Sequence, residues 1–210
     1  MISAVEALEL LRAGNGRFVA DVRSHEILTG HARRRELATG QEPLAIILGC
    51  SDSRVPAELV FDQGLGDLFV IRVAGNIVAP SQVGSVEFAA ARYGTRLVVV
   101  LGHSSCGAIL ATLEEVRRRS EDQSRNLRTI VDRIRPSVEA LLASGLDEDT
   151  LVRQSVRANI RASADHLRHG SETLEQLIQN EGLLVVGAEY SLETGVVDFF
   201  DGAPAARQSS

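Results

Sequence analysis

The sequence contains no tryptophan, two cysteines and no apolar segment long enough to cross a bilayer. Two cysteines in a chain of 210 residues cannot form the disulfide framework that marks small secreted proteins. Metal binding, catalysis and burial remain as the usual roles of the thiols. The first residues also lack the basic leader and apolar block of a secretory signal. We therefore predict a cytoplasmic protein without a membrane partner.

An excess of positive charge is also absent, because 28 acidic residues outnumber 22 basic ones. A protein built to hold nucleic acid needs a broad surplus of lysine and arginine, so no nucleic-acid partner is expected. Two basic runs, Arg33–Arg35 and Arg117–Arg119, lie beside glutamates and lack interleaved aromatic residues. We interpret both runs as solvated helix faces or oligomer contacts.

Short apolar runs alternate with amphipathic helical patterns along the chain. Leu44–Leu48 and Arg96–Leu101 are typical of parallel strands that are buried on both faces. Another strand is predicted over Leu68–Val73, and Leu183–Tyr190 with Val196–Phe200 predict a closing hairpin. The predicted fold class is α/β, with a central, mostly parallel β-sheet flanked by helices and a C-terminal antiparallel hairpin.

Helix signals set the expected order of the other elements. Ser3-Ala4-Val5-Glu6 matches a capping box, and the first helix is expected to end at Gly14-Asn15-Gly16. The helical pattern before Pro136 is expected to stop there, with Pro136 beginning another short helix. A chain of this length can bury a substantial core as one unit, so we predict a single domain over residues 1–202 and a flexible tail at 203–210.

Two short motifs follow predicted strands, Cys50-Ser51-Asp52-Ser53-Arg54 and His103-Ser104-Ser105-Cys106-Gly107. Because the carboxyl ends of parallel strands meet at one edge of a sheet, we expect the side chains of both motifs to share one cleft. Two thiols, an imidazole and a carboxylate are ligands that a catalytic zinc ion prefers, although neither motif is diagnostic alone. A disulfide between the two cysteines, or burial of both as core residues, remains open as an alternative.

Two roles are open to Asp52 if zinc is bound: fourth ligand, or hydrogen-bond partner of a metal-bound water. Arg54 can hold the carboxylate off the metal in a bidentate pair, and an ordinary surface ion pair is the alternative. With the fourth position open, zinc lowers the pKa of its water toward about 7 and provides hydroxide near neutral pH. Hydroxide on zinc attacks small electrophilic carbons.

The two motifs, extended to Val55 and back to Gly102, strongly resemble those of the β-class carbonic anhydrases, and the likeness covers roughly residues 1 to 200. The resemblance implies reversible hydration of carbon dioxide to bicarbonate. It also implies a homodimer or homotetramer, in which an N-terminal helical arm (residues 1–40) packs on a neighbouring subunit.

The same resemblance implies roles for individual residues. Cys50, His103 and Cys106 match the ligands of a Zn²⁺ ion. Asp52 matches a carboxylate that alternates between metal ligand and partner of Arg54, so both residues take part in catalysis.

Four further positions match residues of the substrate pocket. Gln41 matches an amide that hydrogen-bonds substrate across the dimer interface, and Gly107 matches a backbone donor beside the substrate. Phe69 and Phe88 match apolar walls, which suit a substrate without a dipole. Each side chain has a simpler alternative, since both phenylalanines fit a core position and Gln41 fits a turn.

Some members of the family bind a regulatory bicarbonate through a tryptophan, an arginine and a tyrosine. Arg72 and Tyr190 match the last two, but Ile47 stands where the tryptophan would be. We therefore hypothesise that such inhibition is weak or absent in this chain.

Two other functions remain as alternatives. The first is a relative that hydrolyses carbon disulfide or carbonyl sulfide with the same zinc chemistry. The second is a zinc-stabilised protein without turnover. Arg54 argues against the second, because a purely structural site has no use for a residue that frees the fourth position.

Overall fold

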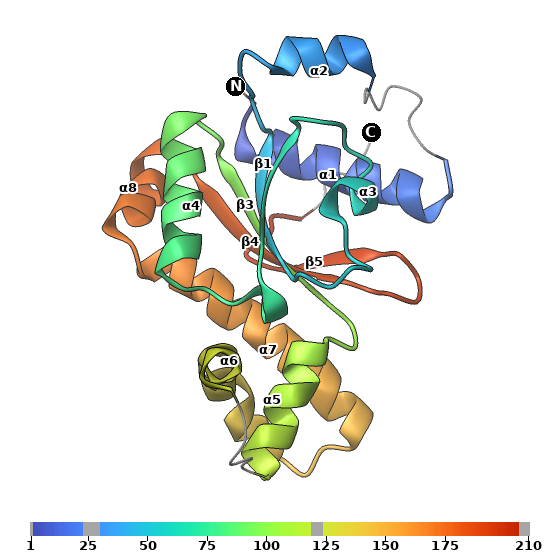
Figure 1. Ribbon diagram of the computed structural model, residues 1–210, viewed down its shortest axis with the longest axis vertical. Coiled ribbons are helices and arrows are strands. Elements are labelled where there is room, and N and C mark those ends of the chain that lie inside the picture. Colours follow the sequence, from blue (N-terminus) through green and yellow to red (C-terminus); the bar gives the residue numbers. More distant parts are fainter. Residues whose placement is uncertain (1, 23–29, 119–123, 206–210) are drawn as a thin grey trace.

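The computed structural model describes residues 2–22, 30–118 and 124–205, and its centre is a five-stranded sheet in the order β2-β1-β3-β4-β5 (Figure 1). The strands are β1 (Ala45–Gly49), β2 (Leu68–Arg72), β3 (Leu97–His103), β4 (Leu184–Tyr190) and β5 (Val197–Asp201). The first four pair in parallel, and β5 pairs antiparallel with β4. The predicted fold class and closing hairpin are confirmed.

Helices cover both faces of the sheet, as Figure 1 shows. They are α1 (Ala4–Val19), α2 (His31–Leu37), α3 (Ala57–Val60), α4 (Pro80–Arg92), α5 (Gly107–Arg117), α6 (Arg125–Leu142), α7 (Glu148–His169) and α8 (Glu172–Glu181), with a 3-10 turn, η1, at Ala74–Asn76. One core lies between the sheet and α1 with α3, and a larger core lies between the opposite face and helices α4 to α8.

Both central strands, β1 and β3, are buried along their whole length. Successive side chains of a strand point to opposite faces, so Ile46 and Leu48 enter the larger core while Ile47 enters the core beneath α1. Burial on both faces explains why these strands are continuous apolar runs rather than alternating patterns.

The contact between α7 and the sheet depends on two glycines. A Cβ atom on Gly102 of β3 would lie 2.5 Å from Cδ1 of Ile160, and one on Gly187 of β4 would lie 2.9 Å from Cγ2 of the same side chain. Ile160 is fully buried. The absence of two side chains therefore allows α7 to approach the carboxyl half of β3 closely.

The start of α1 agrees with the predicted capping box. The amide of Glu6 donates to Oγ of Ser3 at 3.2 Å, and the amide of Ser3 donates to Oε2 of Glu6 at 2.8 Å. Asp147 and Ser171 cap the first turns of α7 and α8 in the same way, each by accepting a backbone N–H three residues further on.

The predicted end of the first helix at Gly14-Asn15-Gly16 is wrong, because α1 continues to Val19. Gly14 lies so close to the backbone of Phe61 that a Cβ atom would come within 1.9 Å of the carbonyl oxygen. Tertiary packing against α3 thus holds a segment in the helix that local propensity disfavours.

The prediction for Pro136 is also wrong, because the residue lies inside the continuous helix α6. Proline removes one intrahelical hydrogen bond, which normally breaks a helix. Val131, Ile134 and Val138 nevertheless form one buried stripe that runs past the proline. A continuous helix keeps all three side chains on one buried face, and this burial stabilises it more than a break at Pro136 followed by a second helix.

The N-terminal segment packs on its own chain, where Leu8 and Leu11 are fully buried. By contrast, α2 has no buried residue and lies away from the sheet in Figure 1. The predicted contact of residues 1–40 with a neighbouring subunit stays a prediction. Residues 1 and 23–29 of that arm, and 206–210 of the predicted tail, lie outside the described residues.

The two basic runs form ion pairs on helix surfaces. Arg33 in α2 pairs with Asp67 at 3.0 Å, and Arg117 at the end of α5 pairs with Glu148 at 2.7 Å. Arg119 lies outside the described residues. Within the described part of the chain, no helix combines the length and the apolar character that a bilayer span requires.

Candidate metal centre

The fold brings together both cysteines and one histidine at the carboxyl end of the parallel strands. Cys50 directly follows β1, His103 is the last residue of β3, and Cys106 caps α5. Because β1 and β3 are parallel neighbours, the two chain segments leave the sheet side by side. The three buried side chains place their ligand atoms within 4.8 Å of one another. The two motifs therefore meet at one place, as predicted.

The two cysteines are free thiols rather than a disulfide. Their Sγ atoms lie 4.0 Å apart, about twice the length of an S–S bond. This separation suits two ligands of one metal ion, so the alternative of a disulfide is not supported.

The imidazole of His103 is oriented as a metal ligand requires. Nδ1 lies 2.9 Å from the carbonyl oxygen of Ser104 and donates its proton there, which leaves the lone pair on Nε2 directed at the cluster. Nε2 is buried and has no hydrogen-bond partner among the described residues. An unpaired buried nitrogen is costly, and a metal ion between the two thiols would relieve that cost.

The electrostatics of the cluster also favour a bound cation. A hydrogen bond from the thiol of Cys106 lowers the pKa of Cys50 to about 4, against the opposing effect of burial. The same bond and burial raise the pKa of Cys106, because its proton is held by the Cys50 thiolate. Burial opposes charge on the ring of His103, whereas the adjacent Cys50 sulfur raises its pKa. Without a cation the pair thus holds one thiolate and one thiol, and a second thiolate in this space would need a divalent cation to balance it.

The predicted bidentate pair between Asp52 and Arg54 is present beside the cluster. Nε of Arg54 donates to Oδ1 of Asp52 at 2.9 Å, and Nη2 donates to Oδ2 at 2.8 Å. These bonds hold the pKa of Asp52 well below its usual range. Oδ2 remains 3.8 Å from Nε2 of His103. Asp52 thus faces the cluster with both oxygens engaged by the guanidinium.

Arg72 holds the loop that carries the first motif. Its Nε donates to the carbonyl oxygen of Cys50 at 3.1 Å, and its Nη2 donates to that of Asp52 at 2.6 Å. Arg72 is the register partner of Gly49, immediately before the loop. Sequence reasoning considered Arg72 only for bicarbonate binding. The parallel pairing of two predicted strands was the signal that could have indicated this contact.

Gly75 and Asn159 form a second support that sequence reasoning missed. The amide of Gly75 donates to Sγ of Cys50 at 3.4 Å, and Nδ2 of Asn159 donates to the carbonyl oxygen of Gly75 at 2.8 Å. Asn159 is 2% exposed. An asparagine in a long helix carries no local signal for such a role, because the contact spans 84 residues of sequence.

Three of the predicted substrate residues lie together, but away from the cluster in this chain. Nε2 of Gln41 donates to the hydroxyl of Tyr93 at 3.0 Å, and the rings of Phe69 and Phe88 lie 6.3 Å apart. Phe69 pairs with Ile46 near the start of β1, at the opposite end of the strand from the metal motif. Within one chain, the structure does not bring these side chains to the cysteines.

Gly107 differs from the other three predicted substrate residues. It is the first residue of α5 and directly follows Cys106, so its backbone lies beside the metal cluster.

Sequence comparison places the metal motifs inside a recognised family region. A family model described as carbonic anhydrase matches residues 45–197, which include both motifs. Carbonic anhydrase 2 of Mycobacterium tuberculosis is 38% identical over 191 residues, or 91% of this chain and 90% of that protein. The carbonic anhydrase of Mycolicibacterium smegmatis is 38% identical over 194 residues, or 92% of each chain.

Solved structures show the same fold. The β-carbonic anhydrase CafA of Aspergillus fumigatus matches with a TM-score of 0.74 and 27% identity, over 92% of this chain and 90% of that chain. One of the two tetrameric β-carbonic anhydrases of Sordaria macrospora matches with a TM-score of 0.72 and 24% identity, over 96% of this chain and 100% of that chain.

Proposed function

This chain belongs to the β-carbonic anhydrase family, and from that premise we propose a zinc centre held by Cys50, His103 and Cys106. The activity of the family is the reversible hydration of carbon dioxide to bicarbonate and a proton. The remaining question is what each residue of this chain contributes to that activity.

The observation that carries the zinc proposal is the buried, unpartnered Nε2 of His103 among the described residues, facing two thiols. Two sulfurs and one imidazole nitrogen form a donor set typical of catalytic zinc sites, which keep one position open. Bound there, zinc supplies a Lewis acid that activates water near neutral pH. The hydrogen bond from Nδ1 of His103 to Ser104 fixes the ring in the orientation that ligation needs.

Arg54 and Asp52 then control access to the fourth position. The guanidinium donates to both carboxylate oxygens, so it would hold Asp52 off a bound zinc ion and leave the fourth position to water. The low pKa of Asp52 keeps the carboxylate anionic, and it can accept a hydrogen bond from that water. Release of Arg54 would let Asp52 become the fourth ligand and close the site.

We propose that a neighbouring subunit completes the substrate pocket, in a homodimer or homotetramer. Gln41, Phe69 and Phe88 lie far from the cysteines of their own chain, and Phe88 is 52% exposed. In a symmetric pair, the aromatic surface of each subunit could face the metal centre of the other subunit. The backbone N–H of Gly107 would then provide the donor from the same chain as the metal.

We also propose a cytoplasmic location. Ligation requires both cysteines as free thiols, and a reducing compartment keeps them in that form.

Stopped-flow measurement of carbon dioxide hydration against pH, with zinc content determined on the same samples, tests the proposal. The wild-type protein is expected to carry zinc and to be active. Replacement of Arg54 by glutamine should retain zinc but lower the rate by roughly 10- to 100-fold, the usual effect of losing a residue that orients the centre. Arg118→Gln, which removes an exposed arginine remote from the cluster, serves as the matched control.

Two results would contradict the proposal. A fully metallated wild-type protein that is inactive at every pH would exclude the enzyme and favour the zinc-stabilised protein without turnover. Wild-type activity in Arg54→Gln would exclude the proposed control of the fourth position.

A further inference from the structure

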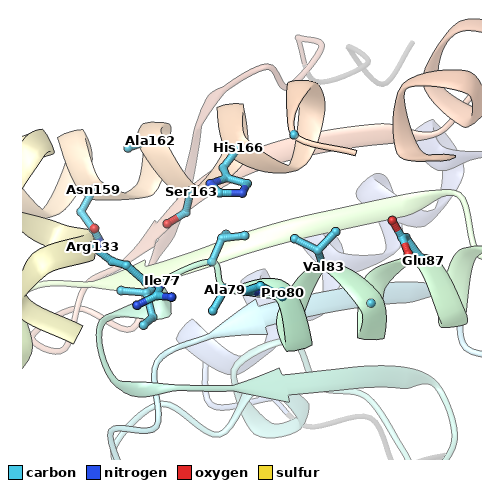
Figure 2. A pocket seen from close by; sticks show the side chains of 13 residues that line it. Ile77, Ala79, Pro80, Val83, Glu87, Arg133, Asn159, Ala162, Ser163 and His166 are labelled. Carbon is cyan, nitrogen blue, oxygen red and sulfur yellow. The ribbon is translucent and has the colours of Figure 1, made fainter. Parts of the chain in front are cut away.

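A cavity of about 640 Å³ lies between α4, α6 and α7, separate from the metal centre. Figure 2 shows this pocket and the side chains that line it. Neither cysteine nor His103 is among the lining residues. Its volume is within the range typical of small-molecule sites. The pocket therefore lies outside the predicted metal ligands, although Asn159 belongs to both its lining and the support of Cys50, and it has the capacity for a separate ligand.

One side of the pocket is apolar. Ile77 follows η1, and Pro80 and Val83 belong to the first turns of α4. In Figure 2 these side chains face α7 across the pocket. Such a wall suits a methylene chain or another apolar body.

The opposite side presents a hydroxyl that is available to a ligand. Ser163 of α7 is 5% exposed and lines the pocket, and Figure 2 shows its oxygen directed into the space. Among the described residues, no other group forms a hydrogen bond with this hydroxyl. A buried hydroxyl without a protein partner favours a ligand or water that can provide one. Asn159, one turn earlier in α7, lines the same end of the pocket.

Opposite charges stand at the two ends of the pocket. Arg133 of α6 lies near Asn159, whereas Glu87 of α4 lies at the far end (Figure 2). Arg133 donates to the carbonyl oxygen of Thr129 at 2.8 Å and pairs with no carboxylate within the described part of the chain. Glu87 accepts a hydrogen bond from Ser171 at 2.5 Å and likewise has no cationic partner there.

We propose that this pocket is a second ligand site, which takes a linear zwitterion with an apolar spacer. The carboxylate of the ligand binds Arg133 and Ser163, its ammonium group binds Glu87, and its methylene chain lies on Val83. The pocket runs along α7 from Asn159 to Gly170, so a ligand that reaches both charged ends needs a spacer of several methylene groups. An ω-amino acid such as 6-aminohexanoate has such a spacer.

Ligand-observed NMR titration of the zinc-loaded protein with three probes tests this proposal. The probes are 6-aminohexanoate, hexanoate, which lacks the ammonium group, and hexylamine, which lacks the carboxylate. If both charged ends bind, 6-aminohexanoate should bind roughly tenfold more tightly than either of the other two, as expected for a charged hydrogen bond. Equal affinity for all three probes, or no saturable binding of any, would overturn the proposal.

Three variants locate the binding. Arg133→Gln should weaken 6-aminohexanoate and hexanoate by roughly tenfold and leave hexylamine unchanged, whereas Glu87→Gln should weaken 6-aminohexanoate and hexylamine and leave hexanoate unchanged. Glutamine at position 87 can still accept the hydrogen bond of Ser171, which protects the fold. Arg128→Gln removes another exposed arginine of α6 outside the pocket and should change nothing.

The variant series also separates this pocket from the zinc centre. A carboxylate that binds at the zinc instead would keep its affinity in Arg133→Gln, and that result would refute the second site. The proposal does not depend on the activity of the enzyme, because every readout is the affinity of a probe.

Discussion

Replacement of Asn159 by alanine is predicted to weaken zinc binding, although Asn159 is not a metal ligand. Its side chain donates to the carbonyl oxygen of Gly75 at 2.8 Å, and the amide of Gly75 donates to Sγ of Cys50 at 3.4 Å. Gly75 also has a φ of 69°, a left-handed conformation that must be held in place by its surroundings. Asn159 therefore fixes the peptide that supports the first thiolate.

The expected magnitude follows from the buried carbonyl group. Leaving the buried carbonyl of Gly75 unsatisfied costs about 1–3 kcal/mol. Ligation of zinc would require Cys50, and with it Gly75, in the positions described. The zinc affinity of the variant would fall by the part of this cost that a metal-free loop could avoid by letting the oxygen reach water. Because about 1.4 kcal/mol corresponds to a tenfold change in affinity, we expect the zinc dissociation constant to rise by roughly 10- to 100-fold.

Competition for zinc against a chromophoric chelator measures this constant directly. The apoproteins of the wild type, Asn159→Ala and Asn126→Ala would be titrated in parallel, and their thermal unfolding recorded without zinc. Asn126 is an exposed asparagine of α6 and provides the matched control, which should bind zinc like the wild type.

A wild-type zinc affinity in Asn159→Ala would refute the reasoning. If the unfolding temperature of the apoprotein is lowered at the same time, Asn159 stabilises the fold without positioning the metal ligand.

Two further predictions concern stability. Gly14→Ala should lower the free energy of unfolding by about 1–3 kcal/mol, because the new Cβ would lie 1.9 Å from the carbonyl oxygen of Phe61. A Cβ on Gly16 would have no atom within 4 Å, so Gly16→Ala should raise the free energy of unfolding by about 0.5–1 kcal/mol. Equal effects of the two substitutions in urea unfolding would contradict this prediction. The pKa of Asp147 is lowered from 3.8 by the backbone N–H of Thr150, so its ionised form adds stability that is complete above pH 3.8 and lost as pH falls through the lowered pKa. The stability advantage of the wild type over Asp147→Asn should therefore shrink in acid, and a difference independent of pH would refute this effect.

The metal ligands could be predicted because their signal is local. A continuous apolar run predicts each buried strand, and the residue types that follow it predict the chemistry. Parallel strands then bring Cys50, His103 and Cys106 to one edge without any knowledge of the helices. The pairing of Asp52 with Arg54 was equally accessible, since the two residues are two positions apart. They lie in a turn closed by the hydrogen bond from the amide of Val55 to the carbonyl oxygen of Asp52, not in the extended segment that the sequence suggested.

The features that sequence reasoning missed depend on distant contacts. The side chain of Asn15 donates to the carbonyl oxygens of Val60 and Gly195, which are 45 and 180 residues away, and these bonds help to keep α1 intact past the expected stop. The sequence around Asn15 predicts neither hydrogen bond. The continuation of α6 through Pro136 was missed for the same reason, because the buried stripe stabilises the helix by packing against α5 and α7, which lie outside the local pattern around Pro136.

Gly102 and Gly187 have a consequence for transplanting this centre. A designer who copied only the three ligands onto the ends of another parallel sheet would obtain the correct atoms on an unsupported loop. Bulkier residues at the two positions under Ile160 would hold α7 further from the strands, and Asn159 would no longer reach Gly75. A transplanted site would thus need, besides the three ligands, the supports at Arg72, Gly75 and Asn159 and two glycines that leave room for α7.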